Sequence, residues 1–303
     1  MKRIAGLAVV LLVALGALYF AQRRPRQDAV NSEALVDAAA DWQRDLTRAP
    51  MNLTRLSDDE EVRIGDRLAA QYEAMQPASD PESKALERYV DQIGERVASQ
   101  AARRLPWHFH LLDDVNLINA FALPGGHVFV GRGLLDQMSS EDEAAFVLGH
   151  EIEHIDHYHA VERVQVEAHL HHFDLNVVGA LAQVPMSVWQ AGYEKDEELE
   201  ADREGLRAAV AAGYSPQGAV KLLQRWTELH RDYIIHADTP VDEMSQLAVA
   251  GLTGYFRSHP LPEERLAQVE QVIAHDRMPA DRPLMPFHLE YEITAGDVSD
   301  SHP

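Results

Sequence analysis

EDEAAFVLGHEIEHIDHYHAVER, residues 141–163, is the most informative stretch of the chain. It carries His150 and His154 four residues apart, so on a helix both imidazoles lie on one face and can reach a single ion. Glu151 follows the first histidine and is rotated from it by about 100° around the helix axis. Its carboxylate can there accept a proton from a water that an ion activates. The pattern HExxH therefore predicts a metal site with a general base beside it.

The third protein ligand of such a site has to come from elsewhere, since a catalytic zinc usually takes three and leaves one position for water. On a continuous helix His157 lies about 10.5 Å along the axis from His150, and His159 lies about 180° around it. We therefore expect both to be structural or on the surface. The longer pattern HExxHxxGxxH also fails, because it requires histidine where the chain has Ala160.

A better candidate lies in EKDEELEADREG, residues 194–205. Glu198 and Asp202 are four residues apart, so they share one face of a second helix. Glu198 could be the third ligand, while Asp202 could bind the other ring nitrogen of a ligating histidine and fix its tautomer. By spacing alone, a solvated acidic face is an equally good interpretation.

Composition narrows the classes of function. The 303 residues can bury a full core, and the absence of cysteine means that any metal is held by nitrogen and oxygen ligands, for which 16 histidines are available. The formal net charge is −22, although residues 1–27 contain no acidic residue. A body this acidic repels phosphate backbones, which argues against nucleic acid as a partner.

The N-terminal segment contains an uncharged apolar run, IAGLAVVLLVALGALYFA, at residues 4–21. As a helix it spans roughly 27 Å, just enough for the hydrocarbon core of a membrane. Small residues suited to signal cleavage are poorly placed, and QRRPR at 22–26 suits a membrane surface. We therefore expect residues 1–27 to be a single-pass anchor in a bacterial-type inner membrane, with the acidic body in the periplasm. The alternative is a soluble periplasmic protein after signal cleavage.

The rest of the chain is predicted to be an α+β fold, mostly helical with a small antiparallel sheet. Helical patterns, two of them opened by Ser-x-x-Glu capping boxes at Ser57 and Ser140, cover residues 57–76, 81–101, 140 to about 191, 194–212, 216–231 and 260–276. Strand patterns cover 107–112, 116–123 and 127–131, and the last two form a hairpin around Pro124-Gly125-Gly126. We expect a linker or helical stretch at 28–56, one domain at 57–278 and an irregular tail at 279–303.

Four segments of the chain resemble the gluzincin metallopeptidases of the HtpX, BepA and Ste-type CaaX protease group, particularly the single-domain BepA-like or Oma-like members. They occur in the family's order and, with the sequence between them, cover about half of the chain. The segments are NAFALPGGHVFVGRGLL (119–135), EDEAAFVLGHEIEHIDHYHAVER (141–163), ELEAD (198–202) and SHPLPEERL (258–266). The resemblance implies a zincin-like fold whose active-site helix bears the HExxH pattern.

The resemblance also implies roles for individual residues. One Zn²⁺ per chain would be held by His150, His154 and Glu198, with Glu151 as the catalytic base. Asp202 falls on the family's aspartate behind the ligands.

Three further positions also match the family. His259, in the His-Pro motif, matches a late histidine near the active site that would stabilise the oxyanion or gate access to zinc. His159 falls on a recurrent histidine with a structural role, and Arg265 on the family's usual arginine. Glu153 departs from the pattern, because it is bulkier and more acidic than the residue common there.

The chain is thus expected to be a zinc endopeptidase that hydrolyses peptide bonds through a metal-activated water. The resemblance points to quality control of membrane or envelope proteins, with unfolded or misassembled proteins as substrates. Such substrates could add a strand beside Ala120–Leu123 or His127–Val130, so that recognition uses mainly the backbone. The alternative is a zinc-bearing periplasmic chaperone or assembly factor with latent proteolytic activity, in which the loop with His259 caps the metal.

Overall fold

The structure is a computed structural model that describes residues 56–74, 80–170, 192–236 and 259–287. The predicted anchor, nearly all of the predicted linker and residues 288–303 of the predicted tail lie outside these ranges. All described residues belong to the unit Arg55–Pro303. Within the described ranges, none of the helices has the length and apolar character needed to cross a membrane.

Three short strands form a mixed sheet: β1 (His108–Leu112), β2 (Ala120–Leu123) and β3 (His127–Gly131), in the order β1-β3-β2. The predicted hairpin is confirmed, because β2 and β3 pair antiparallel. β1, however, pairs parallel with β3, so the sheet is not wholly antiparallel. The hairpin reverses the chain between β2 and β3, which leaves β3 running in the same direction as β1. All five residues of β3 are buried, as its central place requires.

The turn of the hairpin depends on glycine. Residues Pro124–Gly126 form a short 3-10 turn in which Gly125 has a φ of 80°, a conformation that side chains with a Cβ rarely adopt. A Cβ at Gly125 would also lie 2.7 Å from the Cα of Val62 on the neighbouring helix. The Pro-Gly-Gly sequence thus lets the hairpin turn closely against that helix.

Most of the described chain is helical, as predicted. The helices are α3 (Asp58–Glu73), α4 (Pro81–Ala98), α5 (Arg132–Leu135), α6 (Glu141–Asp156), α7 (His159–Leu170), α10 (Lys195–Ala211), α11 (Gln217–His236) and α13 (Pro262–His275). The helical pattern predicted from residue 140 to about 191 forms two helices as far as the structure describes it, because α6 ends at Asp156 and α7 begins at His159. Residues 171–191 of that stretch lie outside the described residues.

The two predicted capping boxes have different outcomes. At the start of α3, the Ser57 side chain accepts a hydrogen bond from the Glu60 main chain, and Glu60 accepts one from the Ser57 main chain, so this box is complete. At the start of α6, the Ser140 side chain accepts from the Glu143 main chain. The Glu143 carboxylate instead accepts from the main chain and hydroxyl of Ser139, at 3.0 and 2.7 Å. The second box is therefore only half formed.

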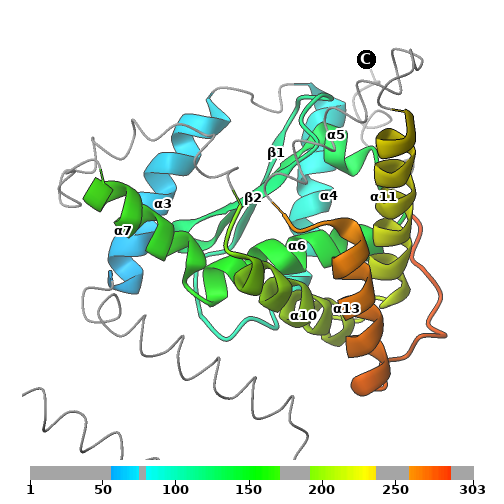
Figure 1. The fold of residues 1–303 in the computed structure, drawn as a ribbon. Coiled ribbons are helices and arrows are strands. Elements are labelled where there is room, and N and C mark those ends of the chain that lie inside the picture. Colours follow the sequence, from blue (N-terminus) through cyan, green and yellow to red (C-terminus); the bar gives the residue numbers. More distant parts are fainter. Residues whose placement is uncertain (1–55, 75–79, 171–191, 237–258, 288–303) are drawn as a thin grey trace, which may run out of the picture. The chain divides into compact units, whose positions relative to one another are not determined.

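Helix α6 is the central element of the fold. All sixteen of its residues are buried, and it contacts β2, α4, α10 and α11. In Figure 1 it lies between the strands and α10. A helix that is buried all round serves as part of the core rather than as a surface layer. The HExxH residues are thus held by packing on every side.

Two glycines let α6 and α10 approach each other at backbone contact. A Cβ at Gly149 would lie 2.6 Å from the Gly205 carbonyl oxygen. A Cβ at Gly205 would lie 2.6 Å from both the Gly149 carbonyl carbon and the His150 nitrogen. No larger residue fits at either position without moving one of the helices. This contact brings the helix with HExxH next to the helix with ELEAD.

The first turn of α6 is also tied to the end of the described chain. The Asp142 carboxylate accepts hydrogen bonds from the main-chain nitrogens of Ser215 and Met285, both at 2.6 Å. In return, the Glu141 nitrogen donates to the Met285 carbonyl at 2.9 Å. Met285, which lies in the predicted irregular tail, is therefore bonded to the first turn of α6.

Candidate active site

Two histidines of α6 and a glutamate of α10 converge in the interior. The Nε2 atoms of His150 and His154 are 3.1 Å apart. The Glu198 carboxylate oxygens lie 3.3 Å from His150 Nε2 and 3.8 Å from His154 Nε2. All three side chains are buried. Two imidazoles and one carboxylate aimed at one point are the donor set of a catalytic zinc with three protein ligands, so these residues fit a Zn²⁺ ion.

The other ring nitrogen of His150 is held by a buried ion pair. Its Nδ1 lies 2.9 Å from Asp202 Oδ1, and the Arg265 guanidinium donates to both Asp202 oxygens at 2.8 and 2.6 Å. Burial tends to lower the pKa of His150, but hydrogen bonds to Asp202 and Glu198 outweigh it and raise the pKa to about 9. The surroundings of this imidazole thus favour positive charge. In the neutral form that ligates a metal, the hydrogen lies on Nδ1 for Asp202 and the Nε2 lone pair faces Glu198 and His154.

His154 is supported by residues outside the two motifs. Its Nδ1 lies 3.0 Å from His159 Nδ1, and its ring stacks on Tyr193 with the centroids 3.8 Å apart. Burial, helped by the nearby His150, lowers the pKa of His154 well below its ordinary value. The imidazole is therefore neutral, which is the form that ligates metals. From the sequence, His159 was expected to be either structural or on the surface. It is buried, which excludes the surface position.

Glu151 is an isolated buried carboxyl group. Both of its oxygens are buried, and neither has a hydrogen-bond partner within the described chain. Burial raises the pKa of Glu151 to about 7, against a smaller opposing effect of His150. Leaving a buried polar group unsatisfied costs about 1–3 kcal/mol, so such a group calls for a functional explanation. A carboxyl that titrates near neutrality can both accept and donate a proton.

His259 is buried and contacts the Glu198 carboxylate. Its Nδ1 is 2.6 Å from Glu198 Oε2, and its ring centroid is 5.1 Å from that of His150. Burial tends to raise the pKa of Glu198, but His259 and His150 outweigh it and hold the pKa well below its ordinary value. The structure thus brings the late histidine into contact with the third candidate ligand. The preceding segment, 237–258, lies outside the described residues.

Tyr193 is a site residue that sequence reasoning missed. Its ring stacks on His154, and its main-chain N–H donates a hydrogen bond to Glu198 Oε1 at 3.0 Å. The Arg163 guanidinium lies 3.8 Å from the centroid of its ring. Its hydroxyl is buried and finds no hydrogen-bond partner in the described part of the chain. The available signal was an aromatic residue directly before the helix of ELEAD, which is too weak to identify it alone.

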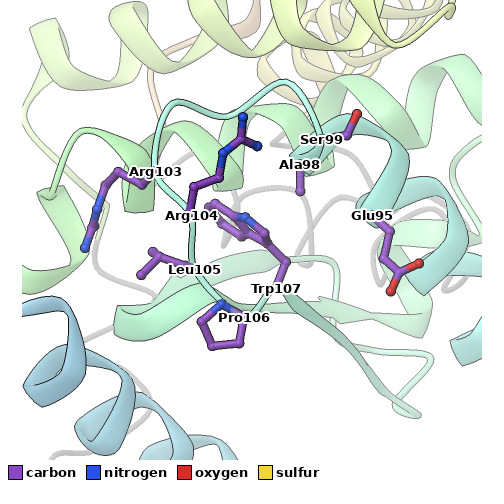
Figure 2. A pocket seen from close by; sticks show the side chains of 8 residues that line it. All are labelled: Glu95, Ala98, Ser99, Arg103, Arg104, Leu105, Pro106 and Trp107. Atoms are coloured by element: carbon purple, nitrogen blue, oxygen red, sulfur yellow. The ribbon is translucent and has the colours of Figure 1, made fainter.

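A surface pocket of about 480 Å³ lies elsewhere, beyond the C-terminal end of α4 (Figure 2). None of the candidate site residues lines it. The lining residues are Glu95, Ala98, Ser99, Arg103, Arg104, Leu105, Pro106 and Trp107. The guanidinium of Arg103 is bonded to Glu61 and Asp58, so this positive charge serves the fold rather than a ligand.

Comparison with known proteins agrees with this geometry. The sequence pattern described as "Peptidase family M48" matches residues 84–273, which include every candidate site residue named above. The chain belongs to the M48 peptidase family. The predicted resemblance and the predicted fold class, mostly helical with a small sheet, are both confirmed.

Several named proteins are similar to the chain. The beta-barrel assembly-enhancing protease of Yersinia pestis is 29% identical over 233 residues, which cover 70% of this chain and 43% of the relative. The protein of the same name from Escherichia coli K12 is 29% identical over 236 residues, with the same coverage. The mitochondrial metalloendopeptidase OMA1 of Schizosaccharomyces pombe is 28% identical over 249 residues, 75% of this chain and 66% of that protein. The chain spans less than half the length of the first two relatives.

Proposed function

We propose that the chain is a zinc-dependent endopeptidase. The observation that carries this proposal is the buried Glu151 carboxyl group, without a partner in the described chain, beside the convergent nitrogens of His150 and His154. His150, His154 and Glu198 would hold the Zn²⁺. When bound, the ion would polarise the scissile carbonyl and lower the pKa of a water molecule.

Glu151 handles the proton in this proposal. Its carboxylate accepts a proton from the attacking water and then delivers it to the leaving amine. A pKa of about 7 suits both steps, because neither protonation state is strongly disfavoured near neutral pH. Burial at 1% exposure keeps competing water away from the carboxyl group.

Tyr193 and His259 have supporting roles. The buried Tyr193 hydroxyl is a donor available to an oxygen that gains negative charge as the carbonyl is attacked. His259 Nδ1, at 2.6 Å from Glu198, orients this carboxylate and acts as a positioning residue. Asp202 fixes the tautomer of His150 through its 2.9 Å contact.

Substrate recognition is proposed to use the edge of the sheet. Of the two segments considered from the sequence, His127–Val130 belongs to the central strand β3, which already pairs on both sides. β2 is an edge strand and contacts α6, so an added substrate strand there would run near the candidate ligands. Pairing through the main chain would suit unfolded or misassembled proteins, which share no side-chain motif.

The test is replacement of Glu151 with glutamine in the full chain. We expect Glu151→Gln to retain zinc, because no ligand changes, and to cleave casein about 10²- to 10⁴-fold more slowly. The matched control is Glu270→Gln, which changes an exposed glutamate of α13. Zinc content and casein turnover are measured together. Undiminished turnover by Glu151→Gln would sink the proposal.

A second candidate function has one observation in its favour. His150, Glu151, His154 and Glu198 are at most 1% exposed, so a substrate cannot reach them without movement of the chain. This closure suits a zinc-bearing chaperone or assembly factor whose proteolytic activity is latent. Complementation of a deletion strain by Glu151→Gln would favour this role, and failure to complement would favour the protease.

The proposed location is the bacterial-type inner membrane, with residues 1–27 as anchor and the peptidase domain, residues 57–278, in the periplasm. Support comes from the apolar run at 4–21 and from relatives named for beta-barrel assembly. The proposed role is quality control of envelope proteins. Digestion of the domain by added protease in spheroplasts, but not in intact cells, would support this topology, and protection in both would refute it.

A further inference from the structure

The chain bends sharply just after the candidate metal ligands. Between α6 and α7, Tyr158 has a φ of 67°, which is rare for a residue other than glycine. Such a backbone costs of order 1–3 kcal/mol and persists only where the surrounding structure holds it. On a continuous helix, His157 and His159 would point about 200° apart. The bend instead brings their ring centroids to 5.9 Å.

Contacts with a distant part of the chain hold the bend in place. The Arg103 guanidinium lies 3.9 Å from the centroid of the Tyr158 ring, and it donates to the Ile155 carbonyl at 2.8 Å. Arg103 is anchored in turn by a buried ion pair with Glu61. The positions of His157 and His159 are therefore a property of the packed fold and not of a loose turn.

A carboxylate from α10 completes a cluster at this point. One potential ligand atom from each of His157, His159 and Glu200 lies within 4.8 Å of the others. The His157 Nδ1 is buried and, in the described chain, has no hydrogen-bond partner. Glu153 adds a second carboxylate, with one oxygen 3.7 Å from His157 Nε2. Two imidazoles with carboxylates suit zinc and other first-row divalent ions.

We propose that His157, His159 and Glu200 form a second divalent metal site, suited to Zn²⁺, whose ligands are separate from those of the first. The buried Glu153 carboxyl group lies beside this site, in contact with His157. This interpretation also accounts for Glu153, which is bulkier and more acidic than the family's usual residue. The second site rests on its own ligand geometry and does not require that the chain cleave peptide bonds.

The two sites share a contact through His159. Its Nδ1 faces His154 Nδ1 at 3.0 Å, so an ion in the second site has to take Nε2. A neutral imidazole carries one N–H. When His154 ligates through Nε2, its hydrogen lies on Nδ1 and is donated to His159, whose own hydrogen then occupies Nε2. An ion in one site therefore weakens binding in the other, and this coupling rests on the proposed function of His154.

Zinc binding to the full chain tests the second site. The metal-free protein is titrated with Zn²⁺ by calorimetry, and bound zinc is counted by elemental analysis after dialysis. We expect two classes of site in the wild type, and loss of only one class in His157→Ala and in Glu200→Gln. The matched controls, His275→Ala and Glu270→Gln, change exposed residues of α13 and should keep both classes. Circular dichroism checks the fold of each variant.

Removing the first site tests the coupling. In Glu198→Gln the remaining class should bind Zn²⁺ about 5- to 150-fold more tightly, the usual range of coupling between sites. A wild type that binds one zinc, lost in Glu198→Gln and kept in His157→Ala, would overturn the second site and leave the proposed function intact. Two classes that both survive in His157→Ala and Glu200→Gln would also overturn it. A wild type that binds no zinc would overturn both proposals.

Discussion

Replacing Gly205 with alanine would test how the backbone contact between α6 and α10 sets the spacing of the candidate ligands. The added Cβ would lie 2.6 Å from the Gly149 carbonyl carbon and from the His150 nitrogen, whereas ordinary contact begins at 3.4 Å. The difference, 3.4 − 2.6, requires about 0.8 Å of separation. Both crowded atoms belong to the main chain, so no side chain can rotate away to relieve the contact.

Two opposing effects determine the stability of Gly205→Ala. Alanine is better than glycine inside a helix by about 1 kcal/mol. Overpacking costs about 1–3 kcal/mol, and a contact with main-chain atoms belongs at the upper end. We therefore expect a net loss of about 2 kcal/mol in the free energy of unfolding, measured by urea denaturation.

Zinc affinity should fall as well, because the proposed ligands come from both helices. A shift of 0.8 Å exceeds the roughly 0.2 Å tolerance of metal–ligand distances several-fold. We expect the affinity for zinc to decrease about 10- to 100-fold, which is the usual effect of mutating residues that orient metal ligands. Competition with a chromophoric chelator measures it.

Gly94→Ala is the control for crowding alone. A Cβ there would lie 2.4 Å from the Phe109 ring, where α4 packs on β1, and neither residue touches the candidate ligands. This variant should lose stability but bind zinc as the wild type does. The reasoning would be refuted if Gly205→Ala kept both the wild-type stability and the wild-type zinc affinity.

Three other outcomes are expected. Arg265→Ala should lower the free energy of unfolding by about 3–5 kcal/mol in urea denaturation, because it removes the guanidinium that bonds both oxygens of the buried Asp202 carboxylate. Asp80→Ala should destabilise the protein at pH 7, because the Asp80 carboxylate accepts hydrogen bonds from the Ser83 hydroxyl and from the Ser83 and Glu82 nitrogens at the start of α4. Those bonds lower the pKa of Asp80 below its ordinary value. The difference in stability from the wild type should therefore persist above about pH 4 and vanish as the pH falls through the folded-state pKa. Urea denaturation at several pH values measures this dependence. Dialysis against a chelator should lower the melting temperature measured by calorimetry, since free zinc at 100 times its Kd stabilises by about 2.7 kcal/mol.

Local sequence patterns predicted the features of the fold that are determined by residues close together in the chain. The four-residue spacing of His150 and His154 fixes their common face, and Ser57 with Glu60 specifies the start of α3. The Pro-Gly-Gly turn specifies the hairpin. In each case the residues that determine the structure lie within four positions of one another, so their geometry follows from the helix or the turn alone.

Features that depend on tertiary packing could not be predicted in this way. The residues close to Tyr158 in the sequence do not predict its positive φ. The Arg103 side chain that packs on its ring lies 55 residues away in the chain. The sequence therefore left open whether His159 is structural or on the surface, whereas it is buried beside His154. Glu198 was ambiguous for the same reason, since the approach of Gly149 and Gly205 is a contact between distant segments. The parallel pairing of β1 likewise depends on which strand of the hairpin it meets.

The hydrogen bonds of Asp142 have a consequence for biosynthesis. This carboxylate joins the first turn of α6 to the nitrogens of Ser215 and Met285, and residue 285 leaves the ribosome long after α6 does. The helix that bears the proposed catalytic groups is thus not fully anchored in a nascent chain. We expect chains that end at 278 to be cleaved readily by an added protease within α6, and chains that end at 287 to resist. The hydrogen bonds that join α6 to Met285 can therefore form only after nearly all of the described chain has left the ribosome.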